Sequence, residues 1–159
     1  MKTNELMIND WILSPRNNSA YKVDDIIIRS LLIAKDNGKD IDNLFDPIPL
    51  TEDILKANGF EFGLSAEQED FCAMHASCGV SAEKSWVKED GCASYSISWL
   101  DGYVAVSNLK DSRYDGKCKF VHELQHTLRL CGLNELADNF MIKEGGNNDL
   151  DLNSKFEYE

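Results

Sequence analysis

The clearest pattern along the chain is an alternation of apolar and polar residues over residues 94–107. Two alternating runs flank Asp101-Gly102, a dipeptide that readily adopts the positive φ angles of a type I′ turn. The alternation places Tyr95, Ile97 and Trp99 on one face of the first run. This segment is therefore predicted to be a β-hairpin.

A helical pattern follows over residues 117–131 and ends before Gly132. At about 100° per residue, the apolar residues of this segment form one stripe along the helix. The stripe consists of Phe120, Val121, Leu124, Leu128 and Cys131. On the opposite side lie His122, Gln125, His126 and Arg129. We expect an amphipathic helix that packs on a sheet through Val121, Leu124 and Leu128, with both histidines facing water or a shallow groove.

Shorter patterns predict the remaining elements. Residues 5–13 and 21–28 are rich in β-branched and aromatic residues and indicate a small antiparallel unit. Thr51 and Gly59 bracket a short helix at 52–58, and a second helix is expected at 65–76. Because strands and helices come in separate runs, the class is α+β, a small antiparallel sheet with a C-terminal amphipathic helix packed on it. One domain is expected over 1–143, followed by an acidic, mobile tail at 144–159.

Charge changes the picture of possible partners. The 159 residues include 28 acidic and 16 basic side chains, which gives a formal net charge of −12. A negative field of this size repels nucleic acids and anionic membranes, so neither is expected as a partner. The chain also has no long apolar run, and its five cysteines include no Cys-x-x-Cys pair. These features favour a cytoplasmic protein with reduced thiols.

One motif is typical of a catalytic metal site. His122-Glu123-Leu124-Gln125-His126 matches the His-Glu-x-x-His pattern of zinc hydrolases. Residues four apart share one face of a helix, so His122 and His126 are candidate zinc ligands. Glu123 would then be the general base that activates a metal-bound water.

A catalytic zinc ion also needs a third protein ligand. Glu135 is the nearest candidate, and His75 or Asp138 would serve if the fold brought them close. Residues 135–140 (ELADNF) resemble the second motif of the phage-type ImmA/IrrE metallopeptidases, in which a glutamate precedes an Ala-Asn-x-Phe-like run. This resemblance implies a ligand role for Glu135.

A longer resemblance indicates a different class of protein. Residues 4–11 (NELMINDW), 47–52 (PIPLTE), 58–60 (NGF) and 120–126 (FVHELQH) resemble, in order and spacing, a family of small proteins from gut Bacteroidales and their prophages or mobile elements. Members of that family often carry glutamine and asparagine at the positions of Glu123 and His126. The resemblance implies no catalytic residues and no cofactor.

Two functional hypotheses follow from the sequence. The first is a non-enzymatic accessory protein of a phage or mobile element that acts through contacts with a protein partner. The alternative is a zinc-dependent, metallopeptidase-like hydrolase that uses the motif at His122, Glu123 and His126.

Overall fold

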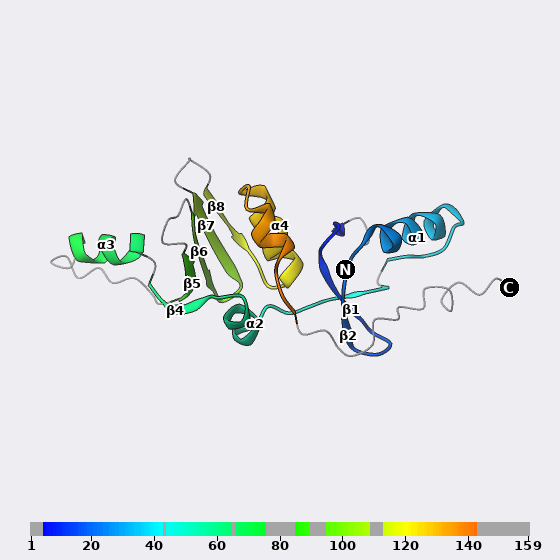
Figure 1. Ribbon diagram of the computed structural model, residues 1–159, viewed down its shortest axis with the longest axis horizontal. Helices are drawn as coiled ribbons and strands as arrows, with labels where there is room; N and C mark the ends of the chain where they lie inside the picture. Colours follow the sequence, from blue (N-terminus) through cyan, green and yellow to red (C-terminus); the bar gives the residue numbers. More distant parts are fainter. Residues whose placement is uncertain are drawn as a thin grey trace. The chain divides into compact units, whose positions relative to one another are not determined.

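The computed structural model describes residues 5–42, 44–64, 66–75, 85–89, 95–108 and 113–142. They belong to two compact units. The chain passes from the first unit to the second between Ile48 and Pro49, and it returns to the first between Met141 and Ile142. Figure 1 shows the helices and strands of both units. Both units combine helices with antiparallel sheet, so the predicted α+β class is confirmed. The single domain expected over 1–143 stays a prediction, and the tail at 144–159 lies outside the described residues.

The first unit is a three-stranded antiparallel sheet with one helix. Strands β1 (Trp11–Ser14) and β2 (Ser19–Lys22) form a hairpin, and β3 (Asp46–Pro47) pairs with the other side of β1. Helix α1 (Asp25–Asp36) follows β2 directly. The buried core of this unit contains Ile12, Tyr21, Val23, Ile27, Leu31, Ala34, Ile41 and Phe45.

Helix α1 corrects the sequence-based expectation of a strand over residues 21–28. The strand ends at Lys22, because Asp24 caps a helix by accepting a hydrogen bond from the Ile27 amide at 2.8 Å. Ile27, Leu31 and Ala34 then bury one face of that helix. The capping aspartate and this periodic burial outweigh the β propensity of the isoleucine run.

The second unit contains a five-stranded antiparallel sheet in sequence order. Its strands are β4 (Glu61–Gly63), β5 (Ser85–Glu89), β6 (Tyr95–Leu100), β7 (Tyr103–Asn108) and β8 (Arg113–Lys117). Its helices are α2 (Glu52–Ala57), α3 (Ala66–His75), α4 (Val121–Leu130) and α5 (Asn134–Asp138). Helices α2 and α3 confirm the two short helices predicted from sequence. None of the described helices combines the length and apolar composition that a membrane crossing requires.

The predicted hairpin is β6–β7. Asp101 and Gly102 have φ angles of 48° and 80°, as a type I′ turn requires. Ile97 lies opposite Val106, and both side chains are fully buried. The apolar face predicted from the alternation is therefore the face that carries the core.

Helix α4 begins four residues later than the predicted start at Lys117. Residues up to Lys117 pair with β7 as strand β8, and the Cys118 amide continues this side by donating to the Gly102 carbonyl at 2.6 Å. The helix contacts β7, and Val121, Leu124 and Leu128 are completely buried. The predicted packing of an amphipathic helix on the sheet is confirmed.

Replacing Leu124 with alanine tests this packing. The cavity left in a fully buried site should lower the free energy of unfolding by about 2–5 kcal/mol, measured by urea denaturation. Leu130→Ala is the matched control, because Leu130 belongs to the same helix and is 75% exposed. The control should change stability by less than about 0.5 kcal/mol, and similar losses in both variants would contradict the assigned face.

Candidate functional site

Glu123, the candidate general base, lies in the first turn of α4. Its Oε2 atom accepts hydrogen bonds from the Lys119 amide at 2.7 Å and from the Phe120 amide at 3.1 Å. These amides precede the helix, and Phe120 is its N-cap residue. The carboxylate thus satisfies backbone donors that a helix start leaves unpaired, as the glutamate of a capping box does.

The two histidines lie next to each other, as the spacing predicted. The His122 and His126 rings meet edge to face with centroids 5.7 Å apart, and the His122 ring also stacks with Phe120 at a centroid distance of 5.9 Å. His122 is only 6% exposed, whereas His126 is half-buried. The expectation that both histidines face water or a shallow groove is therefore wrong for His122.

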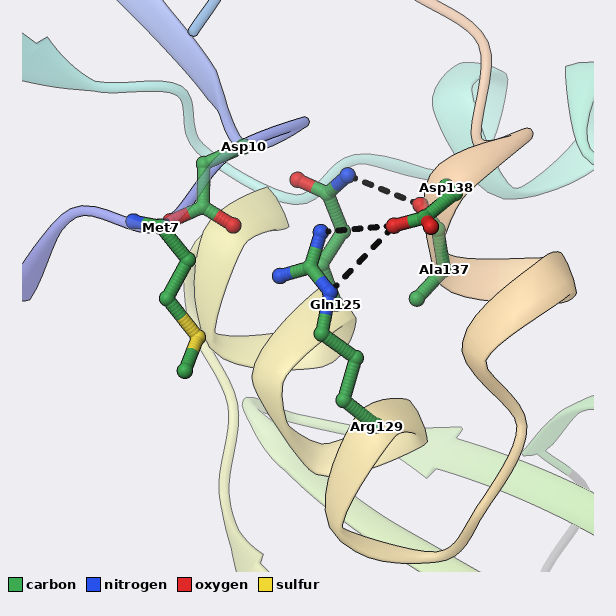
Figure 2. Close-up of polar contacts among 6 residues, drawn as sticks. All are labelled: Met7, Asp10, Gln125, Arg129, Ala137 and Asp138. Carbon is green, nitrogen blue, oxygen red and sulfur yellow. Dashed lines mark hydrogen bonds and ion pairs between the residues drawn. The ribbon is translucent and has the colours of Figure 1, made fainter. Parts of the chain in front are cut away.

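Gln125 explains why the polar side of α4 is not a solvent-facing surface. Its side chain is fully buried, and Nε2 donates to the Ala137 carbonyl of α5 at 2.9 Å (Figure 2). One turn further along α4, Arg129 forms an ion pair with Asp138 at 3.1 Å. Helix α5 therefore packs against the side of α4 that the helical wheel assigned to solvent. The wheel alone lacks this information because α5 follows the Gly132 break.

The candidate third ligands do not complete a metal site. Asp138 is engaged by Arg129, and Glu135 is exposed in the first turn of α5. The side chain of His75, at the end of α3, lies outside the described part of the chain. Among the described side chains, no group of three or more His, Cys, Asp or Glu residues is arranged to hold a metal ion. The structure thus brings His122 and His126 together without Glu135 or Asp138.

Two cysteines flank helix α4 and are buried. Burial, with a smaller effect from the negative charge of Glu123, raises the pKa of Cys118 to about 12. Burial also raises the pKa of Cys131. Because the thiolate is the reactive form, neither residue is poised as a nucleophile near neutral pH.

The structure also contains a pocket that sequence reasoning missed. It has a volume of about 260 Å³ and lies between β4 and β5, where Glu61 and Glu89 are among its lining residues. These strands are separated by a long stretch of sequence, so no local pattern marks the pocket. Of the two glycines in its lining, Gly63 is the one that marks an open space, because a Cβ atom added there meets no heavy atom within 4 Å.

Comparison with protein-family models, with curated proteins and with solved structures finds nothing that matches this chain.

The role of Gln125 can be tested by replacing it with alanine. The change removes the donor to the Ala137 carbonyl and leaves this buried acceptor without its side-chain partner, which should cost about 1–3 kcal/mol of unfolding free energy. Thermal and urea unfolding measure the loss. Glu135→Ala, an exposed change on α5, is the control and should have little effect. If Gln125→Ala left the free energy of unfolding unchanged, the contact with Ala137 would not be what holds α5 in place.

Proposed function

We propose that this chain is a non-enzymatic accessory protein of a phage or mobile element, and that it acts by binding another protein. The observation that carries the proposal is the engagement of Glu123 with the Lys119 and Phe120 amides. A general base must instead direct its carboxylate at the water that it activates. Gln125, within the same motif, is used to hold α5.

The mobile-element part of the proposal is supported by the resemblance to small proteins of gut Bacteroidales prophages. The part that proposes protein contacts in place of catalysis is supported by the structural roles of the residues in the motif. Glu123 caps α4, Gln125 joins α4 to α5, and His122 is buried against Phe120. Under this proposal, the sequence pattern at 122–126 is a packing element.

A zinc hydrolase is the second candidate, and the adjacency of His122 and His126 favours it. For this function, a third ligand would have to approach the histidines. Glu123 would also have to leave the start of α4, which costs about 0.5–2 kcal/mol for a typical helix cap. The hypothesis is therefore testable as a change of structure on metal binding.

Metal analysis of the untagged protein separates the two candidates. After incubation with zinc and dialysis, elemental analysis should find far less than one zinc ion per chain, and the melting temperature should be the same with and without a chelator. His126→Ala is the informative variant, because replacing the buried His122 would destabilise the protein under either hypothesis. Stoichiometric zinc that is lost in His126→Ala would contradict the proposal and make Glu123 the leading general base.

The partner is sought by affinity purification from a gut Bacteroidales lysate, followed by reconstitution from purified components. A specific partner should bind the wild-type chain and Glu123→Gln with equal affinity, because Glu123 has no catalytic task under this proposal. Hydrolysis of a substrate by the wild-type chain, absent in Glu123→Gln, would contradict it.

A further inference from the structure

The sequence contains two Asn-Gly pairs, Asn37-Gly38 and Asn58-Gly59, and each follows the last turn of a helix. Asn37 is the C-cap of α1, with φ and ψ angles of −82° and 10°. Asn58 is the C-cap of α2, with φ and ψ angles of −99° and 14°. The glycines follow in the left-handed region, at φ angles of 75° and 78°. The same dipeptide therefore occurs twice with nearly the same backbone conformation.

The hydrogen bonds that close the two helices also match. At each end, the glycine amide donates to the carbonyl three residues earlier, and the next amide donates to the carbonyl five residues earlier. The four distances range from 2.9 to 3.0 Å. This is the pattern of a Schellman motif. A difference in the reactivity of the two asparagines in the folded protein therefore has to come from their side chains.

The side chain of Asn58 is held at both of its polar atoms. Its Nδ2 atom donates to the carbonyls of Ile54 and Met141, each at 2.9 Å. Its Oδ1 atom accepts a hydrogen bond from the Met141 amide at 2.7 Å. The residue is also buried. The fold of the second unit thus fixes the orientation of this side chain.

The side chain of Asn37 has no such support. Asn37 is exposed, and its side chain forms no hydrogen bond to any residue that the structure describes. A Cβ atom added at Gly38 meets no heavy atom within 4 Å, so no neighbouring group crowds this peptide bond. The Asn37 side chain can therefore rotate toward the Gly38 amide.

An asparagine that precedes glycine can react with the main chain, because a glycine has no side chain to hinder its own nitrogen. The Gly38 nitrogen attacks Cγ of Asn37; a bond forms between these atoms, and the bond from Cγ to Nδ2 breaks. The proton lost by the Gly38 nitrogen returns through solvent to the leaving group, which departs as ammonia. Water then opens the cyclic imide at either carbonyl carbon and gives an aspartyl or an isoaspartyl residue.

We propose that Asn37 is a site of spontaneous deamidation in the folded protein, and that its hydrogen bonds protect Asn58 from the same reaction. Water is the only co-reactant. Reaction at Asn37 requires the Gly38 amide to leave the Lys35 carbonyl, at a helix end where fraying is common. Reaction at Asn58 requires the equivalent opening and also the release of three side-chain hydrogen bonds.

This modification changes the end of α1. It adds a negative charge at a helix C-terminus, where the helix dipole disfavours one. The isoaspartyl product also lengthens the main chain by a carbon atom, which displaces the amide of Gly38 from its position in the helix end. Leu31 and Ala34, in the last turns of α1, belong to the core of the first unit. The aged protein should therefore unfold at a lower temperature than the fresh protein.

Ageing of the folded chain tests this proposal. The protein is incubated at mildly alkaline pH and digested at acidic pH, and mass spectrometry of the peptides detects the exchange of ammonia for water. Deamidation at Asn37 should be at least about tenfold faster than at Asn58, because release of even one hydrogen bond can cost about that factor. In urea, where both side chains are released, the two rates should become similar.

Asn37→Gln is the matched variant, because glutamine keeps the amide but would have to close a larger ring. The folded variant should keep its mass and its melting temperature during ageing, whereas both change in the wild-type chain. Equal rates at Asn37 and Asn58 in the folded protein would overturn the inference, and so would the absence of reaction at Asn37. A preference for Asn37 that persists in urea would also overturn it, because the cause would then be the local sequence.

Discussion

The second unit depends on burial of helix α4 from two sides at once. Leu124 and Gln125 are adjacent, and neither is exposed at all. Leu124 belongs to the stripe that packs on the sheet, whereas Gln125 bonds to α5. A buried side-chain amide is tolerated only when it is hydrogen-bonded. The hydrogen bond from Gln125 Nε2 to the Ala137 carbonyl therefore holds α5 against α4. The same arrangement removes the polar side of α4 from solvent.

The motif shows how the position of a pattern within a helix decides what it does. With Phe120 at the N-cap, Glu123 is the third residue of α4. At this position a glutamate reaches back to the amides that precede the helix, and a negative charge is also favoured by the helix dipole. The spacing that aligns His122 with His126 is present, yet the acid between them is used to start the helix. A helix that began one turn earlier would have released it.

Local signals made much of the fold predictable. The Asp101-Gly102 turn, the Thr51 cap and the apolar stripe of α4 each depend on residues close in sequence, and each matches the structure. The prediction was wrong at α1, because it followed the β propensity of the isoleucine run and overlooked Asp24, which caps a helix. The burial of Gln125 was not predictable, because it depends on α5 folding back against α4. The pocket at β4 depends on register between distant strands.

Net charge and local geometry have different effects on any partner. A chain with a formal charge of −12 attracts basic molecules over a distance of about one Debye length, and salt screens this attraction. Such attraction raises the rate of encounter and does not select one basic sequence over another. Selection requires groups that the fold holds at a fixed spacing, as it holds the buried side chains around α4. Discrimination among basic partners therefore has to come from local geometry, because net charge alone does not provide it.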